Sequence, residues 1–242
     1  MNEEARLYPA VKDFFTGRGY AVRSEVNGCD VVARRGDELV IVELKARVNL
    51  SLILQGVDRK QIADAVYLAV PAPRRPRRER WSQVVRLCRL LGLGLLAVTV
   101  WRGGSRVDVA CEPQPSRAGK GARRRRLLEE FSGRSGDYNV GGSTRRPLVT
   151  AYREEALRIA HYLSGRAQAP LRAIREEAGA ARAASILQKN YYGWFRRVSR
   201  GVYALTAAGE RALEEFRDVV IHFNEKPQRI EYRRGSILRG GD

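Results

Sequence analysis

The fold of this chain is decided by residues 27–45, which read NGCDVVARRGDELVIVELK. Residues 29–34 and 39–44 form two short runs rich in aliphatic side chains, and the dipeptide Gly36-Asp37 separates them. Short apolar runs joined by a glycine-containing turn are typical of a β-hairpin. Because both runs are largely apolar, we predict that the two strands are buried within a larger sheet.

Three charged residues stand at one end of this hairpin. Asp30 begins the first strand, and Glu43 and Lys45 lie near the end of the second. In an antiparallel pair the start of one strand meets the end of the other, so we expect Asp30 beside Glu43. Residues two apart on a strand share a face, so Glu43 and Lys45 are expected to project together.

The two acids, if adjacent, create an oxygen-rich site that suits Mg²⁺ or Mn²⁺. Such a metal can activate a water and offset charge on a phosphate, while a nearby lysine orients or polarises the nucleophile. A solvated cross-strand ion pair is the alternative interpretation, because Glu-x-Lys is common on exposed strands. The apolar residues at 31–32 and 40–42 favour the metal site, since buried strands rarely hold charges without a function.

The rest of residues 1–111 fits a mixed α/β domain. Apolar residues at helical spacing predict helices over 4–16, 50–63 and 81–91. Strand-like runs occupy 20–26, 65–70, 95–101 and 106–110. This order of elements predicts a mixed sheet flanked by helices. Glu25, close to the Asn27-Gly28 turn, is open to a role near the two acids or on the surface.

Residues 112–146 change in composition and predict a basic linker. They contain Pro113, Pro115, several glycines and a block of arginines at 123–126. One helical turn is expected near 127–131. The arginine block is open to two interpretations, which are contact with phosphates and a solvated charged face.

Residues 147–222 predict a second domain of the winged helix-turn-helix class. Helices are expected at about 150–163, 170–179 and 181–194, followed by a hairpin at 198–205 and a closing helix capped by Thr206. The third helix is expected to bury Leu187, Tyr191 and Trp194. Residues 223–242 are expected to form a weakly structured tail.

The third helix of a winged helix enters the major groove of DNA, and the wing contacts the backbone. A winged helix that binds another protein is the alternative interpretation. The side chains suited to DNA contacts are Arg182, Gln188 and Lys189 on the third helix and Arg196, Arg197 and Arg200 on the wing.

The overall composition favours a nucleic-acid partner. Lys and Arg number 45 against 27 Asp and Glu, and the formal net charge of +18 attracts polyanions. The alternative is a genome that places arginine wherever a solvated charge is needed. Two histidines and three widely spaced cysteines disfavour zinc sites, disulfide frameworks and histidine-based triads. The polar N-terminus and short apolar stretches lead us to expect a cytoplasmic protein without a membrane span.

The motif of Asp30, Glu43 and Lys45 resembles that of the PD-(D/E)XK nuclease superfamily, which includes restriction-endonuclease-like and archaeal Holliday-junction-resolvase-like domains. The resemblance covers residues 4–110, and residues 133–156 and 191–206 are similar to a bacterial group of PD-(D/E)XK-type phosphodiesterases. It implies a restriction-endonuclease-like α/β fold, with Asp30 and Glu43 as metal-binding acids and Lys45 as the catalytic lysine. Cys29 stands where the family pattern has proline.

The resemblance also points to two further site residues. Glu4, or less so Glu3, matches an acid on the first helix that some members use as an outer metal ligand. Gln55 resembles a glutamine that some branches place near the active site. The implied function is a Mg²⁺- or Mn²⁺-dependent DNA endonuclease or phosphodiesterase. The alternative is a non-catalytic DNA-binding regulator that uses the nuclease fold as a scaffold. Processing of RNA or branched DNA and a homodimer are left open.

Overall fold

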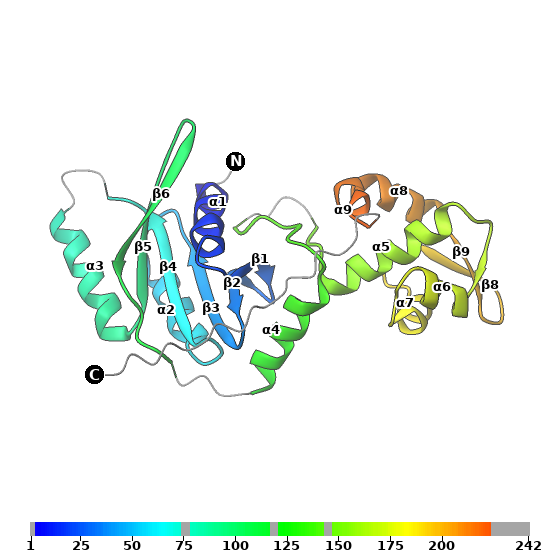
Figure 1. Ribbon diagram of the computed structural model, residues 1–242, viewed down its shortest axis with the longest axis horizontal. Helices are drawn as coiled ribbons and strands as arrows, with labels where there is room; N and C mark the ends of the chain where they lie inside the picture. The colour runs from blue at the N-terminus through cyan, green and yellow to red at the C-terminus, as the bar shows by residue number, and fades with distance from the viewer. Residues whose placement is uncertain (1–2, 74–77, 117–120, 143–146, 224–242) are drawn as a thin grey trace, which may run out of the picture. The chain divides into compact units, whose positions relative to one another are not determined.

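The chain divides into two compact units between Leu148 and Val149. The computed structural model describes residues 3–73, 78–116, 121–142 and 147–223 (Figure 1). The first unit contains the β-hairpin with the three charged residues, and the second contains the helices and short hairpin of the C-terminal part.

The first unit is built on a six-stranded sheet whose strands lie side by side in chain order (Figure 1). Strands β1 to β3 are antiparallel, β3 to β5 are parallel, and β6 returns antiparallel to β5. The strands are β1 (Ala21–Val26), β2 (Cys29–Arg35), β3 (Glu38–Leu44), β4 (Ala65–Pro71), β5 (Gly94–Trp101) and β6 (Gly104–Cys111).

Helices cover both faces of this sheet. Helix α1 (Glu3–Thr16) packs on one face, whereas α2 (Leu50–Arg59), α3 (Arg78–Leu91) and α4 (Ala122–Gly133) pack on the other. Side chains alternate between the two cores, so Val31 and Val42 lie under α1 while Val32 and Ile41 lie under the other three helices. Each such buried side chain contributes about 2 kcal/mol. The expected mixed sheet flanked by helices is confirmed.

The β2–β3 hairpin turns at Gly36, whose φ of 60° lies in the left-handed region that glycine adopts without strain. The register pairs Val31 with Val42 and Val32 with Ile41. The predicted antiparallel pairing of these two strands is therefore present. It places the start of β2 level with the end of β3.

The segment 112–146, expected to be a linker, contains the twelve-residue helix α4, which packs against the sheet of the first unit. Leu127 and Phe131 of α4 are buried against the sheet. Arg124 donates to the Ile62 and Asp37 carbonyls at 2.8 and 3.1 Å and to Asp64 Oδ2 at 2.8 Å. Long-range packing and ion pairs of this kind order a segment whose local composition is typical of a loop.

The second unit consists of helices with a three-stranded sheet in the order β7-β9-β8. Thr150 and Thr206 cap the helices α5 and α8 by accepting from the N–H groups of Arg153 and Gly209. The elements are α5 (Ala151–Ser164), β7 (Ala169–Pro170), α6 (Leu171–Glu177), α7 (Ala183–Lys189), β8 (Phe195–Ser199), β9 (Val202–Leu205), α8 (Ala207–Glu215) and α9 (Arg217–Ile221).

Helix α7 is shorter than the sequence predicts: it ends at Lys189, whereas the predicted helix continues to residue 194. Asn190 adopts a left-handed conformation, with φ of 42°. Its side chain donates to the Phe195 carbonyl at 2.7 Å and accepts from the Phe195 N–H at 3.2 Å. These bonds stabilise the turn that ends α7. The prediction that Tyr191 is buried is therefore wrong, since its exposure is 69%, whereas Trp194 is buried as expected. Of the expected tail at 223–242, residues 224–242 lie outside the described residues.

Candidate active site

Asp30 and Glu43 lie side by side at one end of the β2–β3 hairpin. Because Val31 pairs with Val42, the residue before Val31 faces the residue after Val42. The two carboxyl groups interact electrostatically, because the charge of Asp30 raises the pKa of Glu43. Asp30 Oδ2 also accepts a hydrogen bond of 2.8 Å from the Leu44 N–H. The structure thus brings together the two acids that the hairpin pattern pairs.

Glu43 is shielded from water, whereas Asp30 is half-buried. Glu43 is only 1% exposed. Burial raises the pKa of Glu43, and the negative charge of Asp30 raises this pKa further. Burial also raises the pKa of Asp30, whereas the Leu44 N–H and the charge of Lys45 lower it. A buried carboxylate and its half-buried neighbour ionise together only when positive charge is close, so this location favours a cation.

Lys45 lies beyond the end of β3, which stops at Leu44. Its Nζ is 3.3 Å from Oε1 of Glu4 on α1, whereas Glu43 bonds to Arg59 of α2. The two side chains that were expected to project together are therefore held by different helices, since the two-residue repeat of a strand ends with the strand. Lys45 still acts electrostatically on Asp30, whose pKa it lowers.

Arg59 is a site residue that the sequence pattern does not reveal. Its Nε donates to Glu43 Oε1 at 2.6 Å, and another of its nitrogens donates to the Gly28 carbonyl in the β1–β2 turn. The only sequence signal was its spacing of four residues from Gln55, which places both on one side of α2. Gln55 itself is half-buried, and within the described ranges no hydrogen bond of its side chain is found.

The segment 134–142 lies against Asp30 and Glu4. A Cβ on Gly141 would lie 2.8 Å from the Asp30 carbonyl oxygen, and a Cβ on Gly142 would lie 2.8 Å from Glu4 Cβ. The Gly142 N–H donates to Glu25 Oε1 at 2.7 Å. Only a glycine pair allows the backbone to approach both Asp30 and Glu4 this closely.

Two charged side chains anchor this segment to the first unit. Asp137 accepts from the N–H and hydroxyl of Ser24 at 2.9 and 3.0 Å and from Lys12 Nζ at 2.6 Å. Arg134 donates to the Ser24 and Glu25 carbonyls at 2.9 and 2.8 Å. Sequence reasoning missed these residues because they lie in a stretch of linker-like composition.

The residues present fit a small divalent cation with oxygen ligands. Mg²⁺ is often held by one or two carboxylates and completed by waters and substrate phosphates. Asp30 and Glu43 supply such a pair. In the part of the chain that the structure describes, no group of three or more His, Cys, Asp or Glu is arranged to hold a metal.

The candidate DNA-contacting residues of the second unit differ in whether their side chains are paired within the protein or exposed to solvent. Arg182 is engaged within the unit, where its Nε lies 2.6 Å from Glu155 Oε2 and its guanidinium donates to the Ala151 carbonyl at 3.1 Å. Gln188 and Lys189 are exposed on α7. The exposed candidates on and next to β8 are Arg196, Arg197 and Arg200.

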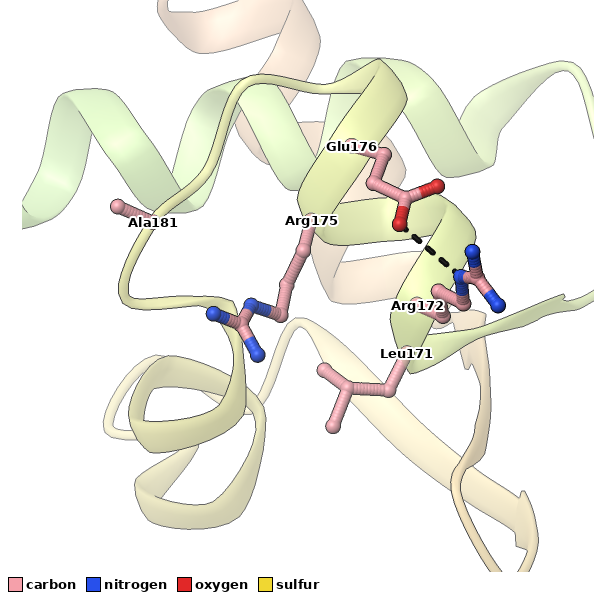
Figure 2. A pocket seen from close by; sticks show the side chains of 5 residues that line it. All are labelled: Leu171, Arg172, Arg175, Glu176 and Ala181. Carbon is pink, nitrogen blue, oxygen red and sulfur yellow. Dashed lines mark hydrogen bonds and ion pairs between the residues drawn. The ribbon is translucent and has the colours of Figure 1, made fainter.

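A cavity of about 450 Å³ opens beside α6 in the second unit. Figure 2 shows Arg172 bonded to Glu176 at its rim, with Arg175 extended away from this pair. None of its lining residues is a candidate site residue, so the cavity adds nothing to the site described above. The lining residues are Leu171, Arg172, Arg175, Glu176 and Ala181.

Comparison with known proteins gives a match to a family model. Residues 96–212 are similar to a family described as "Putative PD-(D/E)XK phosphodiesterase (DUF2161)". The matched stretch begins in β5 and ends in α8, so it does not include Asp30, Glu43 or Lys45. The similarity supports the PD-(D/E)XK superfamily, and the six-stranded mixed sheet flanked by helices fits such a fold. No curated protein and no solved structure matches the chain.

Among the described helices, none has the length and apolar character needed to cross a membrane.

Proposed function

We propose that this protein is a divalent-metal-dependent phosphodiesterase that hydrolyses DNA, with an active site formed by Asp30, Glu43 and Lys45. The observation that carries the proposal is the pair of carboxyl groups on neighbouring strands, of which Glu43 is buried and Asp30 half-buried, with the Lys45 ammonium acting on Asp30. The family similarity covers a different part of the chain and supports the same class of reaction. The net charge of +18 supports a polyanionic substrate.

Asp30 and Glu43 are the residues that hold the metal, Mg²⁺ or Mn²⁺. The Leu44 N–H donates to Asp30 and orients its carboxylate, while Arg59 donates to Glu43. A divalent ion held there would supply Lewis acidity for the activation of a water and for offsetting negative charge on the phosphate.

Lys45 provides the hydrogen-bond donor of the site. Its ammonium group donates to the attacking water or to a non-bridging phosphate oxygen and stabilises the charge that develops there. Glu4 lies 3.3 Å from the Lys45 Nζ and holds it in place. This contact supports a positioning role for Glu4 over the role of outer metal ligand.

The second unit is proposed to be a winged helix that binds the DNA. Helices α5, α6 and α7 precede the β8–β9 hairpin, and β7 pairs with β9, an order that fits this class. The proposed groove contacts are Gln188 and Lys189, and the proposed backbone contacts are Arg196, Arg197 and Arg200. Arg182 is proposed to contribute less, because Glu155 already pairs with it.

A non-catalytic DNA-binding regulator is the second candidate function. One observation favours it, since the charges of the motif are paired within the protein, Glu43 with Arg59 and Lys45 with Glu4. Under this alternative the motif serves as a structural ion-pair cluster, and the protein binds DNA without cutting it.

Cleavage assays separate the two functions. Supercoiled plasmid, end-labelled duplex and flap oligonucleotides, and an RNA of the same sequence are incubated with the protein in Mg²⁺, Mn²⁺ or EDTA. The proposal predicts cleavage of DNA that requires the metal and stops in EDTA. Binding of DNA without cleavage of any form, in either metal, supports the regulator instead.

A further inference from the structure

The site contains a fixed positive charge of its own in Arg59. The Arg59 guanidinium lies between Glu43 and the β1–β2 turn, where it bonds to Glu43 Oε1 at 2.6 Å and to the Gly28 carbonyl. The Arg59 side chain is 12% exposed, and its partner Glu43 is almost fully buried. Arginine stays charged at every pH a protein tolerates, so this charge can be moved but cannot be titrated away.

Next to Arg59, a second ion pair joins Asp58 of α2 to Arg123 of α4. Asp58 Oδ2 lies 3.8 Å from Arg59 NH1, and both oxygens of Asp58 accept from Arg123, at 3.0 and 2.6 Å. Charges therefore alternate in sign from Glu43 through Arg59 and Asp58 to Arg123. Arg59 thus has a carboxylate on either side, of which Glu43 is the buried one.

We propose that Arg59 is the resident counter-cation of the site, which neutralises Glu43 in the metal-free protein and competes with the divalent ion for it. The proposal rests on the proposed function in taking Glu43 as a metal ligand. The buried Glu43 cannot be an anion beside the half-buried Asp30 without a cation, and Arg59 is the cation whose bond reaches Glu43. A divalent ion held by Glu43 meets a guanidinium at hydrogen-bonding distance from that carboxylate, and like charges at such a distance repel strongly.

The consequence is a metal affinity that Arg59 keeps low. The ion binds the two carboxylates only if its attraction to them exceeds the attraction between Glu43 and the Arg59 guanidinium. Removing the charge of Arg59 therefore tightens metal binding, whereas removing a residue that merely holds the fold together loosens or abolishes it. These opposite directions make the role measurable apart from cleavage.

The test measures binding of Mn²⁺ alone to the full-length protein, from the electron paramagnetic resonance signal of free Mn²⁺. The variant Arg59→Met removes the charge at similar length, and Arg59→Gln removes it while keeping a hydrogen-bond donor. Both are expected to bind Mn²⁺ on the order of tenfold more tightly than wild type. Arg59→Lys keeps the charge and is expected to stay within about threefold of wild type.

Arg123→Met is the matched control, because it removes an exposed arginine of the same row that does not touch Glu43. Solvent screens its charge, so its Mn²⁺ affinity is expected to stay within about twofold of wild type. Circular dichroism identifies the variants that are folded. If Arg59→Met is unfolded, Arg59→Gln carries the comparison.

The outcomes distinguish this inference from the function on which it rests. Tighter Mn²⁺ binding in the charge-removing variants supports the role of Arg59. Unchanged or weaker binding in these variants, with binding still lost in Glu43→Gln, overturns the inference and leaves the proposed metal site standing. Absence of Mn²⁺ binding in wild type and in every variant overturns both.

Discussion

Lys45 Nζ lies 3.3 Å from Oε1 of Glu4, so a carboxylate from the first helix holds the lysine of the hairpin motif. Glu4→Gln removes the charge that positions Lys45. Because loss of such a supporting contact typically costs ten- to a hundredfold, we expect kcat for DNA cleavage to fall by about tenfold. Mn²⁺ affinity is expected to stay within about twofold of wild type. A loss of Mn²⁺ affinity in Glu4→Gln, measured by calorimetry, would identify Glu4 as a metal ligand instead.

The close approach of Gly141 to Asp30 predicts that this glycine cannot be replaced. In Gly141→Ala the new Cβ meets the Asp30 carbonyl oxygen, so the free energy of unfolding should fall by about 1–3 kcal/mol and cleavage should drop with it. Gly121→Ala is the control, because nothing lies within 4 Å of a Cβ there. Urea denaturation measures both variants, and equal stability of the two contradicts the described packing.

Arg124 is predicted to act in stability rather than in binding phosphates. Arg124→Ala leaves the Ile62 carbonyl and Asp64 without this donor, so the free energy of unfolding should fall by about 2 kcal/mol. Arg125→Ala, which removes an exposed neighbour, should change it by less than about 0.5 kcal/mol. DNA affinity measured beside the urea curves should change little for Arg124→Ala. A weakened affinity with unchanged stability would favour the phosphate contact.

The cysteine thiols are predicted to be unreactive in the folded protein. Burial raises the pKa of Cys29 to about 12 and that of Cys88 to about 11, and it also raises the pKa of Cys111. Burial disfavours the thiolate, so at pH 8 nearly all of each thiol is protonated. A disulfide reagent that releases a coloured thiol should react slowly with the native protein. In urea the same reagent should react with all the cysteines. Rapid labelling of native protein at pH 8 contradicts the burial.

The arginines of β8 are predicted to contribute to DNA affinity. The double variant Arg196→Ala/Arg197→Ala should weaken binding and reduce the slope of log K against log salt by about two, because two phosphate contacts are lost. Arg182→Ala should change this slope less, since Arg182 is already paired with Glu155. Fluorescence anisotropy over a salt series measures both. A larger change in slope for Arg182→Ala would show that the third helix binds phosphates through Arg182.

The β2–β3 hairpin and its two acids could be predicted because the signals are local. Apolar runs, a glycine turn and the antiparallel rule together place Asp30 against Glu43. The helix caps Thr150 and Thr206 were also visible, since a side-chain oxygen before an apolar helical pattern marks a helix start.

Contacts between distant segments could not be predicted from local signals. Arg59 reaches Glu43 through the rotation of α2 relative to the sheet, which the sequence does not specify. Helix α4 is ordered by Arg124 binding residues about 60 positions away. Helix α7 ends because Asn190 adopts a left-handed conformation. Asparagine marks a helix end less clearly than glycine does, and the aromatic residues that follow Asn190 continue the helical pattern.

The comparison of two glutamates at opposite ends of β3 tests the central claim most directly. Glu43→Gln removes the buried acid, and Glu38→Gln removes an exposed acid that pairs with Arg35 on the surface. Cleavage of supercoiled plasmid in Mn²⁺ is measured for wild type, for both variants and for Lys45→Ala. The account predicts that wild type and Glu38→Gln cut at similar rates, while Glu43→Gln and Lys45→Ala fall by at least about a hundredfold. Equal cleavage by Glu43→Gln and Glu38→Gln would contradict the assignment of this site.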